Sequence, residues 1–357
     1  METPRNERDL PSPTMTPVEV SPSFDGAEWN AFVERAPGAT ADHLWEWRDL
    51  VQDVFGHHAV YLAARRAGNI VGVLPLVLFK STVFGRSVLS LPFLNDGGML
   101  TTDDDARHAL LAAALARGRA FGAAHVEFRH RARQFDHLPY RQHKLGMTRA
   151  LPTTSDELWT SLDRKVRNQI RKAQKEGLEI ATGGVELVDE FYAVFAVNMR
   201  DLGTPVYPKG FFEQVLRRFS DRARISVVRV NGRPAASGIT IAFRRVVANP
   251  WASSLRAFRH LCPNMLLYWE LLDRSVRNGA EVFDFGRSSP DSGTHQFKLQ
   301  WGASELPLHW EYLLLSAAAP PNQGPTNSKF RRAIEIWQRL PVGAANLIGP
   351  RIARHLP

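Results

Sequence analysis

The chain contains one order of elements twice, and this repeat limits its fold more than any other feature. In the first half, two β-rich runs flank a turn at 67–69, a helix follows, and a strand begins after Gly122. In the second half, two β-rich runs flank Asn231-Gly232, a helix follows, and a strand begins after Gly279. Asn-Gly between β-rich runs is a strong hairpin signal. A repeat of this length indicates a duplicated domain and not a solenoid.

An antiparallel hairpin, a helix and a strand in this order are typical of the N-acetyltransferase-like (GNAT) fold. We therefore expect an α/β (α+β) protein with two tandem GNAT-like domains, over residues 18–150 and 151–316. Residues 1–17 are polar and contain four prolines, so this N-terminus is expected to be disordered. Residues 317–357 are expected to form a linker and a basic amphipathic C-terminal segment, with a helix at 328–340.

The second repeat continues into a stretch that combines a strand, a Gly/Ser/Pro loop and a short helix. Residues 282–285 are β-branched and aromatic, and the loop at 286–290 ends the strand. Phe297 and Trp301 are four residues apart, so they share one helix face, and Lys298 projects to its side. A lysine in this position is more often a solvated side chain over a core. A fixed cation there can also stabilise the oxyanion that forms during acyl transfer.

The stretch 283–303 resembles the Fem family of non-ribosomal peptidyl and aminoacyl transferases, and it is most similar to the subset associated with exosortase and exopolysaccharide systems. The resemblance implies tandem GNAT-like domains, with the catalytic segment in the second. It also implies catalytic roles for Lys298, Phe297 and Arg287. The glycine loop 95–98 resembles the family's loop near the acceptor, although aspartate stands at 96 where family members often have an aromatic residue.

A basic helix is expected between a capping box at 154–157 and Gly177. It carries six cations and no acidic residue from 164 to 175. A solvated helix face is the more common explanation of such a run. In the Fem family this region contributes to binding a phosphorylated substrate or donor, so the resemblance implies substrate binding by Lys165, Arg167 and Arg171. The other candidates for substrate binding are Asn198, Arg200, Tyr268 and Trp301; a locally satisfied helix end also explains the first two.

Charge and cysteine content limit the classes of function. The formal net charge of +9 favours anionic partners, namely nucleic acid, phosphorylated precursors or a membrane surface, without choosing among them. Cys262 is the only cysteine and the histidines lack paired ligand spacing, so no metal site is expected. No signal peptide is evident, and the longest apolar run, 70–79, is too short to span a bilayer. We expect a cytoplasmic protein, with peripheral contact at the inner membrane face as an alternative role of the C-terminal helix.

The resulting hypothesis is an acyltransferase that moves an aminoacyl or acyl group onto an amine or hydroxyl of a cell-envelope precursor, of peptidoglycan or exopolysaccharide type. The expected partners are tRNA and a nucleotide- or lipid-linked saccharide, with no bound cofactor. Aminoacyl-tRNA is the expected donor. Acyl-CoA is the alternative, although residues 251–264 contain no glycine where many GNAT enzymes hold the coenzyme A pyrophosphate on a glycine-rich loop. A non-catalytic module that binds tRNA or another anion is the second alternative. No general base is evident.

Overall fold

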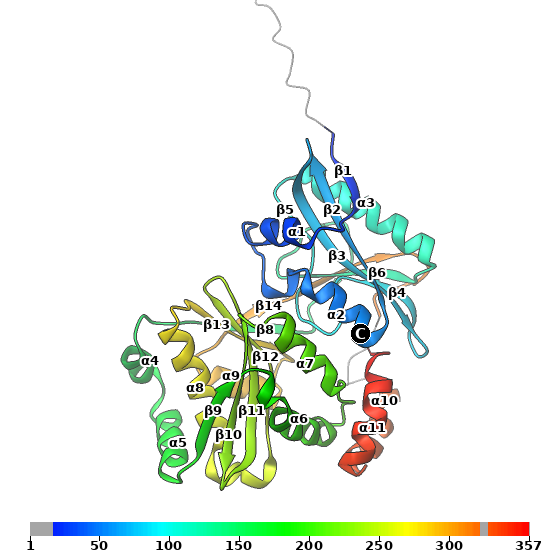
Figure 1. Cartoon of the computed structure of the whole chain (residues 1–357). Coiled ribbons are helices and arrows are strands. Elements are labelled where there is room, and N and C mark those ends of the chain that lie inside the picture. The colour runs from blue at the N-terminus through cyan, green and yellow to red at the C-terminus, as the bar shows by residue number, and fades with distance from the viewer. Residues whose placement is uncertain (1–16, 322–327, 357) are drawn as a thin grey trace, which may run out of the picture.

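The computed structural model describes residues 17–321 and 328–356 and contains two β-sheets, each with helices on both faces (Figure 1). Two sheets covered by helices confirm the predicted α/β class. The predictions for residues 1–16 and 322–327 lie outside the described residues.

The first sheet has the strand order β1-β2-β3-β4-β6-β15-β7, with β5 beside β3. Only β4 and β6 are parallel neighbours. One face packs on α3, and the other packs on α1 and α2, between which lies the 3-10 turn η1. The bounds of these elements are β1 Glu19–Pro22, α1 Gly26–Val33, η1 Ala41–His43, α2 Glu46–Phe55, β2 His58–Arg66, β3 Asn69–Ser81, β4 Gly85–Leu89, β5 Leu100–Thr101, α3 Asp104–Phe121, β6 His125–His130, β7 Tyr140–Arg141 and β15 His309–Leu314.

The second sheet has the order β14-β8-β13-β12-β11-β10-β9, and only β12 and β13 are parallel neighbours. One face packs on α4, α5 and α8, and the other packs on α6 and α7. The bounds are β8 Leu145–Ala150, α4 Ser155–Ser161, α5 Arg164–Lys175, β9 Glu179–Gly183, η2 Val185–Leu187, α6 Val188–Leu202, α7 Lys209–Arg218, β10 Ala223–Val230, β11 Arg233–Phe243, β12 Val246–Ser254, η3 Arg256–Leu261, α8 Pro263–Arg277, β13 Val282–Ser288, α9 Gly293–Leu299 and β14 Ser304–Pro307.

The two halves of the chain exchange strands. β8 follows the first repeat but pairs with β13 in the second sheet. β15 follows the second repeat but pairs with β6 in the first sheet. The division into 18–150 and 151–316 stays a prediction, and the sheets do not follow it at these two strands. The exchange ties each sheet to both halves of the sequence.

One hydrophobic core lies between the sheets and joins the two domains. It contains Trp47 and Phe55 from α2 together with Phe191 from α6 and Phe211 from α7. Trp47 also contacts Trp251 of β12, with ring centroids 6.5 Å apart. This shared core fixes how one domain sits on the other.

The basic helix predicted between 154 and 177 is two helices, α4 and α5. Thr154 caps α4 as expected, because its side chain accepts from the backbone N–H of Glu157 at 3.2 Å. The break follows Ser161, whose hydroxyl donates to the carbonyl of Leu158 and accepts from Arg149. Leu162 is then extended. The prediction of one continuous helix was wrong. Helical spacing of apolar residues does not reveal the hydrogen bond between Arg149 of β8 and Ser161, which lies at the break.

The C-terminal segment forms α10 (Ser328–Gln338) and α11 (Val342–Ala353), beside α6 (Figure 1). Arg200 of α6 donates to the carbonyl of Leu340 at 2.7 Å. The first domain holds the chain end: His57 contacts the carbonyl of Arg354 at 2.7 Å, and Ser81 donates to the carbonyl of His355. The segment therefore contacts both domains.

Candidate functional site

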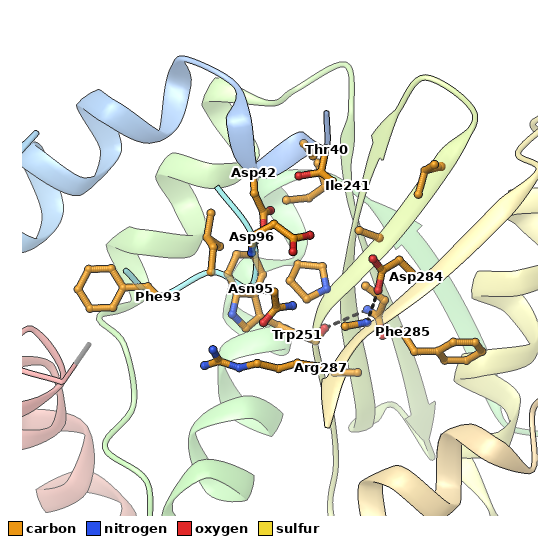
Figure 2. Close-up of a pocket in the computed structure, with 18 of the residues that line it drawn as sticks. Thr40, Asp42, Phe93, Asn95, Asp96, Ile241, Trp251, Asp284, Phe285 and Arg287 are labelled. Atoms are coloured by element: carbon orange, nitrogen blue, oxygen red, sulfur yellow. Dashed lines mark hydrogen bonds between the residues drawn. The ribbon is translucent and has the colours of Figure 1, made fainter. Parts of the chain in front are cut away.

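The second sheet opens where its parallel strands separate. β12 and β13 pair only through Val246–Ala248 and Val282–Asp284, although both strands continue beyond these residues. Gly286 lies in the opening with φ +72°, and a Cβ there would lie 3.4 Å from the carbonyl oxygen of Asn249. Glycine is favoured here because other residues are strained at positive φ. The separated ends border a cavity of about 450 Å³ between the two domains, the interdomain cavity (Figure 2).

A second cavity of about 480 Å³ adjoins the first. Residues of α5, β12, η3, α9 and the first turn of α8 line it, and we name it the α8 cavity. Both cavities are lined by Asn198, Leu202, Ala252, Tyr268, Thr294 and Lys298. These shared side chains place Lys298 at the boundary between the two spaces.

Lys298 is a buried cation, with 7% of its surface exposed. Its Nζ donates to the carbonyl oxygens of Gly286 (3.2 Å) and Arg287 (2.9 Å). An ammonium has three donors, so one remains. Burial lowers the pKa of Lys298 to about 8; Arg287 adds to this effect and Asp284 opposes it. The amine is thus mostly charged at neutral pH.

Packing fixes the direction of the helix that carries Lys298. The hydroxyl of Ser292 accepts from the backbone N–H of His295 at 3.2 Å and caps α9. Phe297 contacts Tyr268 edge-to-face, with ring centroids 4.8 Å apart. Trp301 is fully buried behind them. The ammonium is therefore preorganised, which is what electrostatic catalysis requires.

The α8 cavity is cationic. Lys165, Arg256 and Arg259 line it, and each is exposed. Within 17–321 and 328–356, no acidic residue lines this cavity, and none forms an ion pair with these three. The cavity also adjoins the N-terminus of α8, where the helix dipole favours anions. This space suits a phosphorylated group.

The interdomain cavity, by contrast, has an acidic wall formed by Asp42, Asp96 and Asp284 (Figure 2). Arg131 joins two of these carboxylates: its Nε donates to Asp96 at 2.7 Å and its Nη2 donates to Asp284 at 2.8 Å. Burial raises the pKa of Asp284, although Arg131 opposes this effect.

Arg287 is a further cation of the interdomain cavity, beside Lys298 and Arg131. Its guanidinium lies 5.6 Å from the ring centroid of Trp310, a strand β15 residue. Among the described residues no carboxylate pairs with it. Burial and the neighbouring Arg129 lower its pKa. A half-buried guanidinium without an ion-pair partner is available to an anionic group.

The cavities bring together six of the ten residues predicted from the sequence, namely Lys298, Arg287, Phe297, Lys165, Asn198 and Tyr268. Asn198 donates to the hydroxyl of Ser253 at 3.0 Å. Arg167, Arg171, Arg200 and Trp301 line neither cavity. Arg171 lies over Trp159, Arg200 pairs with Asp201, and Trp301 belongs to the core.

The sequence interpretation missed the acidic wall. Asp284 did carry a signal, because an aspartate between Phe283 and Phe285 places a charge inside a buried strand. The sequence around Asp42 and Arg131 gave no signal that these residues belong to a site. They lie in η1 and directly after β6, and only the packing of the domains brings them to the same cavity as Asp284.

Residues 160–299 match a sequence family described as "Acetyltransferase (GNAT) domain". The chain is an acyltransferase with a GNAT domain. The matched range contains the basic helix α5, the separated strands and Lys298, so the cavities border the GNAT domain. A search of curated protein sequences gave no match.

Solved structures share the fold of the whole chain. A structure titled "Crystal structure of FemX" matches with TM-score 0.66 and 16% identity, over 84% of this chain and 98% of that one. A tandem GNAT protein from the clavulanic acid biosynthesis pathway matches with TM-score 0.53 and 13% identity, over 85% and 100%. L-PGS from Bacillus licheniformis matches with TM-score 0.50 and 14% identity, over 90% and 97%. At such identities the likeness establishes the tandem GNAT fold alone.

Within residues 17–321 and 328–356, no group of three or more His, Cys, Asp or Glu side chains is arranged to hold a metal ion. None of the helices described is both long and apolar enough to cross a membrane.

Proposed function

We propose that the protein transfers an aminoacyl group from aminoacyl-tRNA to an amine of a cell-envelope precursor. The observation that carries this proposal is the position of Lys298 at the boundary of two cavities with different charged linings. The described residues of the α8 cavity include cations and no carboxylate, whereas three carboxylates line the interdomain cavity together with Arg131 and Arg287. The donor enters the cationic α8 cavity, and the acceptor enters the interdomain cavity. The reacting carbonyl then lies at Lys298.

The chemistry follows from the contacts of Lys298. Attack of the amine on the acyl ester turns the carbonyl oxygen into an oxyanion. The third N–H of the ammonium is free to bind that oxygen, since Gly286 and Arg287 hold the other two. Because the ammonium is fixed and buried before the reaction, its stabilisation costs little reorganisation.

The charges outside the α8 cavity favour tRNA as the donor. Helix α5 exposes Arg164, Lys172 and Lys175 beyond the cavity, in addition to Lys165 at its edge. An extended basic surface matches a polynucleotide backbone better than a single pyrophosphate. The segment between β12 and α8 is the 3-10 helix η3 and contains no glycine, so the glycine-rich phosphate loop of many coenzyme A enzymes is absent from residues 251–264.

Arg287 suits an acceptor that carries an anion, such as a nucleotide- or lipid-linked saccharide, because it has no carboxylate partner among the described residues. FemX and L-PGS share the fold, and the sequence resembles the Fem family. Peptidoglycan-type and exopolysaccharide-type precursors, the latter through the exosortase-associated subset, both fit this description. We place the reaction in the cytoplasm, where charged tRNA is found.

A second candidate donor is acyl-CoA, which the match of residues 160–299 to a GNAT acetyltransferase domain favours. Equilibrium binding of charged tRNA to the full chain, with acetyl-CoA as competitor, separates the two donors. Tight, salt-sensitive binding of tRNA that acetyl-CoA does not displace supports aminoacyl transfer. Binding of acetyl-CoA alone moves the assignment to an N-acyltransferase.

Catalysis is tested with Lys298→Met, which keeps the length of the side chain and removes its charge. Mass spectrometry follows transfer from charged tRNA to a UDP-linked muramoyl pentapeptide with a free lysine amine. We expect a loss of about 100-fold or more in turnover, because one oxyanion donor is removed. Lys80→Met, at an exposed position of β3, is the control and should retain activity. An active Lys298→Met variant contradicts the mechanism. If the natural chain binds charged tRNA but forms no product, the protein is a binding module.

A further inference from the structure

The acidic wall contains one carboxylate that differs from the other two. Arg131 forms ion pairs with both Asp96 and Asp284, at 2.5 Å and 2.8 Å. Asp284 also accepts from the backbone N–H of Gly286 at 2.8 Å. Asp42 has no ion-pair partner among the described residues. Its Oδ2 accepts from the backbone N–H of Asp96 at 3.0 Å.

Asp42 is also reachable from the cavity. It lines the interdomain cavity and is partly exposed, whereas Asp96 is 3% exposed. Figure 2 shows the carboxylates of Asp42 and Asp96 close together. The Asp96 Oδ1 atom is buried without a hydrogen-bond partner. This unpartnered oxygen beside Asp42 is able to accept a further hydrogen bond.

The same network leads to Lys298. Asp96 bonds Arg131, Arg131 bonds Asp284, and Asp284 accepts from the N–H of Gly286. The carbonyl of Gly286 then accepts from Lys298. Asp42 and Lys298 therefore stand at two ends of one hydrogen-bonded wall, and both line the interdomain cavity. An acceptor between them has a carboxylate on one side and the oxyanion donor on the other.

We propose that Asp42 accepts the proton that the acceptor's ammonium group must lose before it can attack. The inference rests on the proposed function and adds the general base for that reaction. R–NH3⁺ gives one proton to the Asp42 carboxylate and becomes R–NH2. The nitrogen then forms a bond to the ester carbon, the C–O bond to the donor breaks, and a second proton from nitrogen goes to the leaving oxygen. Asp42 afterwards releases its proton to water.

The charges around Asp42 suit this role. Burial and the nearby charges of Asp96 and Asp284 together raise its pKa to about 7, although the hydrogen bond from the Asp96 N–H and the charge of Arg131 oppose this effect. Arg287 is the other charged group that interacts with it, and the adjacent His43 is uncharged because burial lowers its pKa to about 3. A base with a pKa close to the working pH is the most effective proton acceptor.

Asp96 and Asp284 are less suited to the same role. Each already holds a guanidinium N–H of Arg131, and protonation of either would break an ion pair. Arg131 in turn needs both, because burial alone lowers the pKa of a guanidinium and these two carboxylates raise it. Their function is to hold the wall together, whereas Asp42 can change its charge without breaking an ion pair.

The test is Asp42→Asn in the full chain, assayed with two acceptors of different basicity. Each acceptor is assayed with charged tRNA as the donor and, in a separate reaction, with acetyl-CoA as the donor. One acceptor is the lysine amine of a UDP-linked muramoyl pentapeptide, which is an ammonium at pH 7. The other is hydroxylamine, which is uncharged there and needs no base before it attacks. We expect transfer to lysine to fall about 100-fold and transfer to hydroxylamine to change less than about 2-fold.

The pH profile gives a second readout. For the natural chain, transfer to lysine should rise with pH up to about 7, where Asp42 loses its proton. In Asp42→Asn the rise of transfer with pH should instead follow the pKa of the acceptor's own lysine ammonium. Asp136→Asn, an exposed position in the loop after β6 that lines neither cavity, is the matched control and should behave as the natural chain does.

The outcomes separate the two claims. Equal losses with both acceptors identify Asp42 as a structural residue and overturn the inference, as does an Asp42→Asn variant with full activity toward lysine. In both cases the proposed function stands, because the natural chain forms product. A natural chain that forms no product from either donor with either acceptor removes the proposed function, and the inference with it.

Discussion

At the scale of single residues, the pKa of Asp42 makes a prediction about stability that does not depend on any substrate. Its pKa is about 7 in the folded protein and near 3.8 in the unfolded chain. Between these values the folded state binds more protons, so stability falls as the pH rises from about 4 to 7. Asp42→Asn should remove this slope and raise the free energy of unfolding at pH 8 by roughly 2–4 kcal/mol. Urea unfolding at pH 5 and pH 8 measures it; identical slopes in both proteins would contradict the assignment.

Gly286 gives a second prediction at this scale, with Gly232 as its control. Their φ values are +72° and +73°. An added Cβ would lie 3.4 Å from its nearest neighbour at Gly286, and it would have no neighbour within 4 Å at Gly232. Replacement by alanine should therefore cost about 1–2 kcal/mol of stability at either position. Only Gly286→Ala should also lower transfer, because the carbonyl of Gly286 anchors Lys298. Thermal unfolding and the transfer assay together test this; equal activity losses would exclude a specific role of Gly286.

At the scale of elements, the hairpins and main helices could be predicted from the sequence, whereas their partners could not. Asn231-Gly232 lies between β10 and β11, and Gly122 ends α3 in the left-handed region, as local turn and cap chemistry requires. These signals are local. The exchange of β8 and β15 is not, because both are short strands whose neighbours are set by long-range packing. Lys298 followed from a local block of sequence, while Asp42 and Arg131 meet only in the folded cavity.

Helix α5 carries the prediction for this scale. Lys165 lines the α8 cavity, while Lys172, on the same helix and equally exposed, does not. Lys165→Ala should weaken binding of charged tRNA and reduce the slope of log K against log salt by about 1. Lys172→Ala should have a smaller effect. Filter binding between about 50 and 200 mM salt measures both slopes. A slope for Lys165→Ala equal to that of the natural chain would mean that donor phosphates do not reach the cavity.

At the scale of the whole molecule, the strand exchange makes each domain depend on the other half of the chain. Strand β15 brings Glu311, which is fully buried, into the first sheet. Its carboxylate holds His130 at 2.7 Å and the backbone N–H groups of Gln134 and Phe135 at 3.0 Å and 2.9 Å. Removing a charged acceptor from buried donors costs about 1–3 kcal/mol for each donor that is left. The first domain is therefore incomplete without residues that lie beyond the second.

This dependence predicts how the chain unfolds. The full chain should unfold in one transition, because the exchanged strands and the core between the sheets join the domains. Residues 17–143 alone should fail to fold, since β6 then lacks the neighbour that supplies Glu311. Joining 308–316 to that fragment through a flexible linker should restore a folded monomer, and the same fusion with Glu311→Ala should not. Circular dichroism and size-exclusion chromatography distinguish these states. A stable fragment without β15, or two separate transitions in the full chain, would show that the domains fold independently despite the exchange.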